Sequence, residues 1–312
     1  MNLKRAISGF LLSILFLVIF ACLIFFEGEV LDRFFINQND LDFLSGAISE
    51  GAEDVILRKK NEGFCQSNNI EKPEINAKSA LSVKSSFSGQ DKVILEKNKD
   101  VVLPIASLTK LVTAIIVLDN YNPSDLIKIS KLADSQKAVK QDIKLGDEIS
   151  VDVLLQIMMV GSSNKAAYAL AEHVSLEKFV DLMNEKVRFL GLKNTTFVEP
   201  TGLSPQNVST AEDLSELAKY IMLNYPEIAR ISKIKELYVP GVGLITNTNQ
   251  LLEIFPEIIF GKTGFTEKAG GCLLLITKNL NDKNYLINII LGAEDRFLEM
   301  EALIGWAKTV CD

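Results

Sequence analysis

The segment Ser107-Leu108-Thr109-Lys110 places a hydroxyl and an amine three positions apart. Residues i and i+3 share one face of a helix, and the apolar spacing of residues 107–119 predicts a helix here, so the two side chains can meet. A serine hydroxyl becomes a good nucleophile only when a base takes its proton. A lysine amine serves as that base when burial or a second cation depresses its pKa. The motif therefore predicts a lysine-activated serine, although the same pattern is common on solvent-exposed helices.

A second motif, Ser162-Ser163-Asn164, adds another hydroxyl and an amide after an apolar stretch. Ser162 can relay a proton to a leaving amine, and Asn164 can hydrogen-bond the backbone carbonyl of a substrate. The alternative is structural, since a serine before the helix-forming run 165–170 is a typical N-cap. Taken alone, this motif favours the N-cap.

A third motif, Lys262-Thr263-Gly264, follows the apolar residues 258–260 and Gly261. A strand that ends in lysine and threonine between two glycines allows a peptide to lie along its edge. The cation and the hydroxyl can then hold a carboxylate. An ordinary junction between a strand and a turn is the alternative interpretation.

Hydrophobic spacing around the motifs predicts an α+β domain whose sheet is assembled from both ends of the chain. Two early strands and three late strands enclose a helical middle, and a last helix follows them. The predicted strands are 80–83, 92–95, 258–260, 273–277 and 285–291, and the predicted helices are 107–119, 151–159, 163–173, 176–190, 211–223 and 294–309.

The composition narrows the class of protein further. The chain has 312 residues, 48% of them hydrophobic and 23% charged, which is typical of a globular protein and not of a disordered one. The net charge of −7, with no local basic run, argues against nucleic-acid binding. His173 is the single histidine, and we expect it at a helix end. Cysteines at metal-ligand spacing are missing from the sequence, so we expect neither a metal nor a cofactor.

The N-terminal residues indicate a membrane anchor. Lys4 and Arg5 precede an uncharged apolar run over residues 7–26, and acidic residues follow it. A helix of that length spans about 30 Å, the thickness of the hydrocarbon core of a bilayer. The charge order places the N-terminus in the cytoplasm and the remaining chain outside. A cleaved signal peptide is the alternative, but such a segment is normally shorter and ends in small residues, whereas Phe25 and Phe26 are bulky.

The three motifs occur in this order, about 55 and about 100 residues apart, as they do in penicillin-binding proteins and serine β-lactamases. With four longer strings, residues 76–312 resemble the D-alanyl-D-alanine carboxypeptidase family of low-molecular-mass penicillin-binding proteins, serine peptidase family S11. The strings are residues 104–111, 194–197 with 201–203, 209–214 and 261–266.

The resemblance implies a β-lactamase/transpeptidase-like fold, in which helices flank an antiparallel sheet and form a helical subdomain. One N-terminal transmembrane helix would precede this fold, as a single-pass anchor in a bacterial cell membrane with the catalytic domain outside the cytoplasm. We expect a cytoplasmic stub, an anchor, a stalk of little periodicity and a penicillin-binding D,D-peptidase domain. Their ranges are 1–6, 7–26, 27–75 and 76–312.

The resemblance also implies roles for the motif residues. Ser107 matches the nucleophile that forms an acyl-enzyme, Lys110 matches its general base, and Ser162 matches the relay serine. Asn164 matches the substrate-binding asparagine.

The remaining site residues concern the substrate's carboxylate and carbonyl. Lys262 and Thr263 match the pair that supports the relay and binds the terminal carboxylate. The backbone N–H groups of Ser107 and Phe265 would form the oxyanion hole. Arg296 resembles a family arginine near the substrate carboxylate.

The implied function is a serine-type D-Ala-D-Ala carboxypeptidase that acts on peptidoglycan stem peptides and takes β-lactam antibiotics as covalent inhibitors. A D,D-endopeptidase of cross-links is an alternative with the same motifs. A class A-like β-lactamase would need a glutamate that activates water; Glu199-Pro200 fits such a loop, but the Thr201-Gly202-Leu203 that follows matches the peptidase pattern. All six motif residues are present, which argues against a non-catalytic wall-binding module. Lys165 stands where many relatives carry an acid, which could alter substrate preference.

Overall fold

The computed structural model describes residues 71–86, 91–137, 143–279 and 284–311. The predicted anchor and nearly all of the predicted stalk lie outside these ranges. Within them, no helix combines the length and the apolar character that crossing a bilayer requires.

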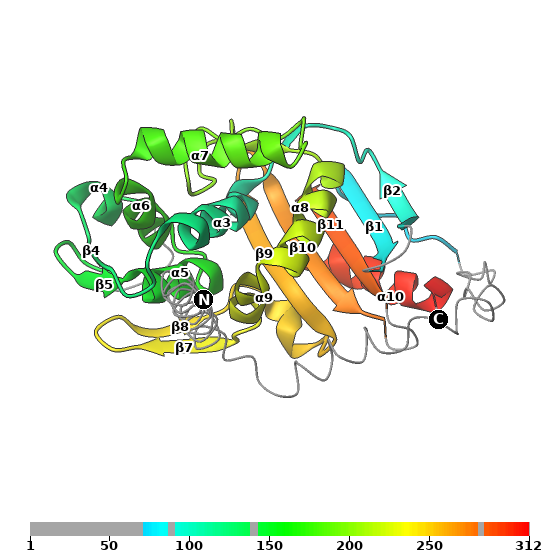
Figure 1. The fold of residues 1–312 in the computed structure, drawn as a ribbon. Coiled ribbons are helices and arrows are strands. Elements are labelled where there is room, and N and C mark those ends of the chain that lie inside the picture. Colours follow the sequence, from blue (N-terminus) through cyan, green and yellow to red (C-terminus); the bar gives the residue numbers. More distant parts are fainter. Residues whose placement is uncertain (1–70, 87–90, 138–142, 280–283, 312) are drawn as a thin grey trace, which may run out of the picture. The chain divides into compact units, whose positions relative to one another are not determined.

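An antiparallel sheet of five strands forms the centre of the described domain (Figure 1). Its order is β2-β1-β11-β10-β9, so strands from both ends of the domain sequence are neighbours, as the hydrophobic spacing predicted. The strands are β1 (Ser79–Ser85), β2 (Lys92–Lys97), β9 (Ile258–Thr266), β10 (Gly270–Lys278) and β11 (Tyr285–Ala293).

Strand β9 is longer than predicted. The expected strand stopped at Phe260, but the observed strand continues to Thr266 and includes the whole Lys262-Thr263-Gly264 motif. The hydrophobic spacing ended with the last apolar residue, whereas pairing extends the strand: Lys262 and Thr263 pair with Leu274 and Leu273 of β10. The third motif therefore lies within an edge strand, which agrees with its interpretation as part of a strand and not with the alternative of a junction between a strand and a turn.

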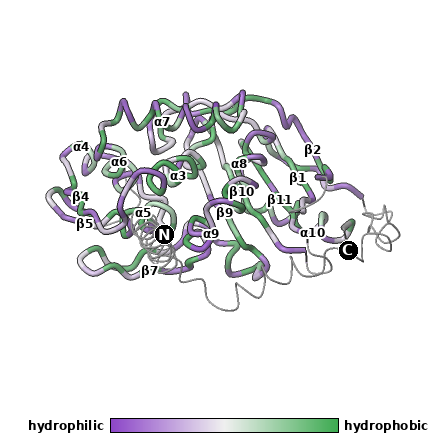
Figure 2. Tube along the Cα trace, in the orientation of Figure 1, coloured by the Kyte–Doolittle hydropathy of each residue, from purple (hydrophilic) through white to green (hydrophobic). Residues whose placement is uncertain are grey.

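Both faces of the sheet are buried, which explains why β10 and β11 are largely hydrophobic along their length (Figure 2). Helix α10 (Arg296–Cys311) packs on β10 and β11, where its Leu303 joins Leu273 and Leu275 in one cluster. Leu274 and Ile276 point to the opposite face and belong to the larger core. Helices α8 (Ala211–Asn224) and α9 (Pro226–Ser232) contact strands of the same sheet.

The remaining helices form a subdomain beside the sheet (Figure 1). They are α3 (Lys110–Asn120), α4 (Lys131–Asp134), α5 (Val151–Val160), α6 (Asn164–Glu172) and α7 (Leu176–Phe189). Short hairpins accompany them, formed by β4 (Leu126–Lys128) with β5 (Glu148–Ser150) and by β7 (Glu236–Val239) with β8 (Gly243–Thr246). Strands β3 (Leu103–Pro104) and β6 (Val208–Ser209) also pair, and η3 (Gln250–Glu253) is a 3-10 turn.

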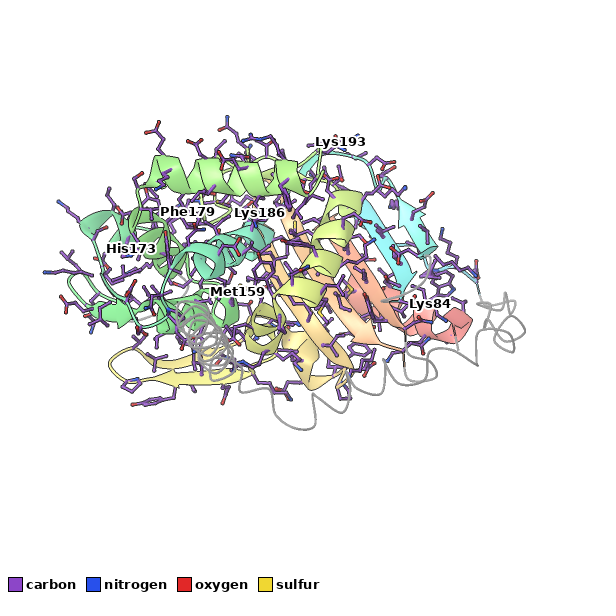
Figure 3. All side chains as sticks on the ribbon, in the orientation of Figure 1. Lys84, Met159, His173, Phe179, Lys186 and Lys193 are labelled. Carbon is purple, nitrogen blue, oxygen red and sulfur yellow. The ribbon has the colours of Figure 1, made fainter. Side chains whose placement is uncertain are left out.

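Side-chain caps set several of these helix starts. The hydroxyls of Ser150, Ser175 and Thr210 accept backbone N–H groups in the first turns of α5, α7 and α8. His173 ends α6, and its ring meets the ring of Tyr121 edge-to-face at 5.0 Å (Figure 3). The expectation that this histidine is a helix-end residue is confirmed.

Candidate active site

Ser107 lies in a 3-10 turn, η2 (Ala106–Thr109), which leads directly into α3. The sequence predicted one α-helix from residue 107, but the first turn is tighter. In a 3-10 turn the side chains at i and i+3 eclipse, so the turn brings the Ser107 hydroxyl directly over Lys110. The turn begins at Ala106 with φ +48°, a left-handed conformation unusual for a residue with a side chain.

Two glycines allow other segments to close around this turn. A Cβ on Gly202 would stand 1.9 Å from the Ala106 carbonyl oxygen, and a Cβ on Gly264 would stand 3.0 Å from the Ser107 nitrogen. The first glycine belongs to the loop before β6 and the second to β9. The nucleophile is therefore enclosed by backbone from both sides, and β9 lies against its N–H group.

Lys110 is fully buried and its ammonium has three acceptors. Its Nζ lies 2.9 Å from the Ser107 Oγ, 2.6 Å from the Asn164 Oδ1 and 2.6 Å from the Thr201 carbonyl oxygen. Burial lowers the pKa of Lys110 to about 7, and the negative charge of Glu199 opposes this effect.

The three acceptors determine how the N–H groups and the lone pair of a neutral Lys110 amine are oriented. The two carbonyl oxygens, of Asn164 and Thr201, can only accept hydrogen bonds, so they fix the two remaining N–H groups. The nitrogen lone pair then faces the Ser107 hydroxyl. This is the geometry that the predicted role of Lys110 as a proton acceptor for that hydroxyl requires.

Each of the two interpretations of the second motif, a helix cap and a site residue, applies to one of its serines. The hydroxyl of Ser163 accepts the N–H of Ala166 at 3.2 Å and caps α6. Ser162 has a left-handed backbone, with φ +54°, and its Oγ accepts a hydrogen bond from Lys262 Nζ at 2.8 Å. The cap is therefore the second serine of the motif, and the first one faces the site.

Lys262 is the second buried lysine of the site, and its Nζ also donates to the Thr263 carbonyl oxygen at 3.1 Å. Burial holds the pKa of Lys262 well below its usual range, and the positive charges of Lys110 and Arg296 lower it further. The three basic side chains thus share one electrostatic neighbourhood, in which a substrate anion would stabilise their charged forms.

Thr263 is buried in β9, and its Oγ1 lies 2.5 Å from the Thr248 Oγ1. Sequence reasoning missed Thr248, because a threonine in a polar loop carries no pattern. It also missed the role of Thr201, which contributes its main-chain carbonyl to Lys110; a carbonyl gives no residue-type signal.

Arg296 begins α10 and stacks its guanidinium over Phe297, at 4.5 Å, with the exposed ring of Phe265 at 6.0 Å. Its Nε is buried and has no hydrogen-bond partner among the residues that the structure describes. Together with its effect on Lys262, this places Arg296 at the edge of the cationic site. Its predicted contact with a carboxylate stays a prediction, as does the oxyanion-hole role of Phe265.

The carboxylate of Glu199 organises its own turn. It accepts the backbone N–H groups of Thr201 at 2.7 Å, Gly202 at 2.7 Å and Ser204 at 3.3 Å, and the side-chain amide of Asn207 at 2.9 Å. Glu199 therefore belongs to a turn that its own carboxylate stabilises. Its oxygens are already engaged, which argues against the water-activating role that a class A-like β-lactamase requires.

Comparison with known proteins agrees with this geometry. Residues 66–295 match the D-alanyl-D-alanine carboxypeptidase family, and the chain belongs to this family of serine peptidases. A D-alanyl-D-alanine endopeptidase of Escherichia coli is 37% identical over 252 residues, which cover 76% of this chain and 79% of that protein. The D-alanyl-D-alanine carboxypeptidase DacC of the same organism is 34% identical over 261 residues, 78% of this chain and 64% of that protein.

A solved structure shows the same fold. Penicillin-binding protein D2 from Listeria monocytogenes, in its cefotaxime-bound form, has a TM-score of 0.68 at 27% identity and covers 76% of this chain and 99% of that chain. The described domain therefore has the penicillin-binding protein/transpeptidase-like fold, with an antiparallel sheet and flanking helices.

Proposed function

We propose that this chain is a serine-type D-Ala-D-Ala carboxypeptidase that trims peptidoglycan stem peptides through an acyl-enzyme on Ser107. The observation that carries the proposal is the buried Lys110 amine, held by Asn164 and Thr201 with its third position on the Ser107 Oγ. The family membership supplies the reaction class.

In the acylation step, the Ser107 Oγ attacks the carbonyl carbon between the two terminal D-alanines while Lys110 takes the hydroxyl proton. The C–N bond then breaks, and the amine of the last D-alanine leaves with the proton that Lys110 took from Ser107, passed on through the hydroxyl of Ser162, which Lys262 Nζ holds by a hydrogen bond. Water hydrolyses the resulting ester and regenerates Ser107. The N–H groups of Ser107 and Phe265 would hold the oxyanion in both halves of the reaction.

The cationic edge of the site supports recognition of a terminal carboxylate. Lys262 and Thr263 line β9 beside the nucleophile, and Arg296 offers an N–H group that has no partner among the described residues. A free carboxylate on the last residue distinguishes a stem-peptide terminus from an internal peptide bond. β-Lactam antibiotics carry an equivalent carboxylate and would acylate Ser107 as covalent inhibitors.

A D,D-endopeptidase that cuts cross-links is the second candidate. The comparison with E. coli favours it, because identity is 37% with the endopeptidase and 34% with the carboxypeptidase. The chemistry is the same, but the leaving amine belongs to a neighbouring stem peptide instead of a free D-alanine.

Purified muropeptides separate the two activities. The protein is incubated with monomeric pentapeptide and with cross-linked dimer, and mass spectrometry follows the products. A carboxypeptidase releases D-alanine from the monomer, whereas an endopeptidase converts dimer to monomers. Ser107→Ala is the control and should abolish both reactions and penicillin labelling; an adduct on another residue would contradict the assignment of Ser107.

We further propose that residues 7–26 anchor the protein in the cell membrane as a single pass, with the peptidase domain outside the cytoplasm and residues 27–75 as its stalk. The apolar run and the charges of Lys4 and Arg5 before it support this topology. A location outside the cytoplasm also places the domain beside its proposed substrate.

A further inference from the structure

The first two residues of α6 hydrogen-bond to three residues that belong to α4 or follow it in the sequence. Asn164 Nδ2 donates to the Lys137 carbonyl oxygen at 2.7 Å. The neighbouring Lys165 donates through Nζ to the Asp134 Oδ1 at 2.6 Å and to the Ile143 carbonyl oxygen at 3.0 Å. Lys165 therefore ties together two positions, one before and one after Lys137, that flank the contact made by Asn164.

The contact to Lys137 fixes which way the Asn164 amide points. A planar amide has an acceptor on one side and a donor on the other, so a carbonyl oxygen at Nδ2 requires Oδ1 to face Lys110. Without the Lys137 carbonyl, a rotation about the last side-chain bond would turn the NH₂ group toward Lys110. That NH₂ would then compete with the Ser107 hydroxyl for the lone pair of the neutral amine.

The ion pair that supports this arrangement is partly shielded from water. The side chain of Lys165 is 15% exposed and that of Asp134 is 36% exposed. A shielded pair with an additional carbonyl acceptor holds its geometry better than a fully exposed surface pair. Lys165 stands where many relatives carry an acid, and a carboxylate at this position could not donate the hydrogen bonds that Lys165 makes to Asp134 and Ile143.

We propose that Lys165 is a positioning residue for the acylation of Ser107. It secures Asp134, three residues before Lys137, so that the Lys137 carbonyl holds the Asn164 amide with its oxygen on Lys110. This inference rests on the proposed function, because it assigns Lys165 to the acylation step of that reaction.

The test compares three variants of the full chain by stopped-flow acylation with penicillin, which separates the binding constant from the acylation rate constant. Lys165→Met removes both hydrogen bonds and should lower the acylation rate constant by about tenfold, since small displacements of catalytic groups have effects of this size. Penicillin binding before acylation should also weaken, but by less than the acylation rate constant, because the reoriented Asn164 amide is a predicted substrate contact as well as a contact of Lys110. Lys165→Arg keeps the donors and should restore most of the rate.

Lys186→Met is the matched control. Lys186 pairs with Asp119 at 2.7 Å, with exposures of 19% and 31%, and lies on α7 (Figure 3). This variant removes a comparable ion pair and should leave acylation unchanged. Thermal unfolding of both variants is measured in parallel, so that a loss of stability is seen separately from a loss of rate.

The pH profile of acylation gives a second readout that a merely structural role would not move. The groups that face Lys110 are the carboxylate of Glu199 and the ammonium of Lys262, and both stay in place in Lys165→Met. Loss of the Asn164 oxygen destabilises the ammonium form of Lys110, so the rising limb should shift to lower pH while its plateau falls. An unshifted limb, a rate within twofold of wild type, or an equal rate loss in Lys186→Met would overturn the proposal. Failure of the proposed function looks different, because the wild-type protein itself would then not be acylated on Ser107.

Discussion

At the scale of single residues, the site depends on two lysines whose side chains are buried away from solvent. Lys110 and Lys262 are both buried, and each has hydrogen-bond acceptors in place of solvent. Burial disfavours their charged forms, and it lowers the pKa of Lys110 to about 7, so that this amine can act as a base near neutral pH. Burial that disfavours the ammonium form of Lys110 therefore also makes its neutral amine available to accept a proton.

The first prediction concerns the pH dependence of acylation. Lys110 accepts the Ser107 proton only when it is neutral, and its pKa is lowered to about 7 from an ordinary value of about 10.4. The rate of penicillin acylation should therefore rise with pH up to about 7 and level off above it, instead of rising to about pH 10. Stopped-flow or gel labelling across this range measures the profile.

The control for this prediction is Lys110→Arg. A guanidinium stays protonated throughout the range, so the variant should be slow at every pH and should show no rising limb. A wild-type profile that is flat from acidic to alkaline pH would contradict the assignment of Lys110 as the base.

At the scale of elements, the sequence predicted the sheet, the helices and the three motifs, but it did not predict how the motifs are presented. The 3-10 turn at Ser107 follows from close contact with β9, a tertiary effect that local spacing does not contain. Serines at 162 and 163 are equally good caps by composition, and only the backbone conformation separates them. The carbonyl of Thr201 had no signal at all, because every residue has a carbonyl.

The second prediction tests the closure around the nucleophile turn. Gly202→Ala would place a methyl group 1.9 Å from the Ala106 carbonyl oxygen on a backbone with φ +87°. We expect the free energy of unfolding to fall by about 3–5 kcal/mol, through steric overlap and left-handed strain together. Penicillin acylation should also be lost, because the displaced backbone carries Ser107.

Gly191→Ala is the matched control, since Gly191 has φ +72° and open space at the Cβ position. It should cost only about 1–2 kcal/mol for the left-handed conformation and keep full acylation. Urea unfolding and penicillin labelling of both variants make the comparison. Equal costs would show that contact with the Ala106 carbonyl does not limit the turn.

The third prediction addresses the turn of Glu199. Glu199→Gln replaces one acceptor oxygen by a donor among the N–H groups of Thr201, Gly202 and Ser204. The free energy of unfolding should fall by about 1–3 kcal/mol, the cost of buried donors without an acceptor. The lifetime of the penicilloyl-enzyme should change little, because the carboxylate serves the turn.

Intact-mass spectrometry of the acyl-enzyme over time measures that lifetime. The β-lactamase alternative makes the opposite statement: wild type would hydrolyse penicillin rapidly, and the Gln variant would trap the acyl-enzyme. That pair of results would make Glu199 the deacylation base.

At the scale of the whole molecule, the peptidase domain joins a sheet to a helical subdomain, and the site residues come from both. Ser162 and Asn164 belong to the helical part, whereas Lys262 and Thr263 belong to β9. The Lys262–Ser162 hydrogen bond therefore connects the site across the two parts, whereas the Lys110–Asn164 hydrogen bond lies within the helical part. The chain has a net charge of −7, yet the basic side chains of Lys110, Lys262 and Arg296 lie near one another at this junction. Local burial, and not the overall charge, determines which substrate the site attracts.

The last prediction concerns the N-terminal run of residues 7–26. A helix of this length matches the bilayer core, so the full-length protein should stay in the membrane pellet after washes with high salt and with alkaline carbonate, which release peripheral proteins. Leu15→Arg with Val18→Arg places two charges near the middle of the run, each costing about 2.5–3.5 kcal/mol there. This variant should be lost from the carbonate pellet. Intact mass of the wild-type protein from cells decides between anchor and signal peptide, because a mature chain that begins near residue 28 would mean that the segment is removed.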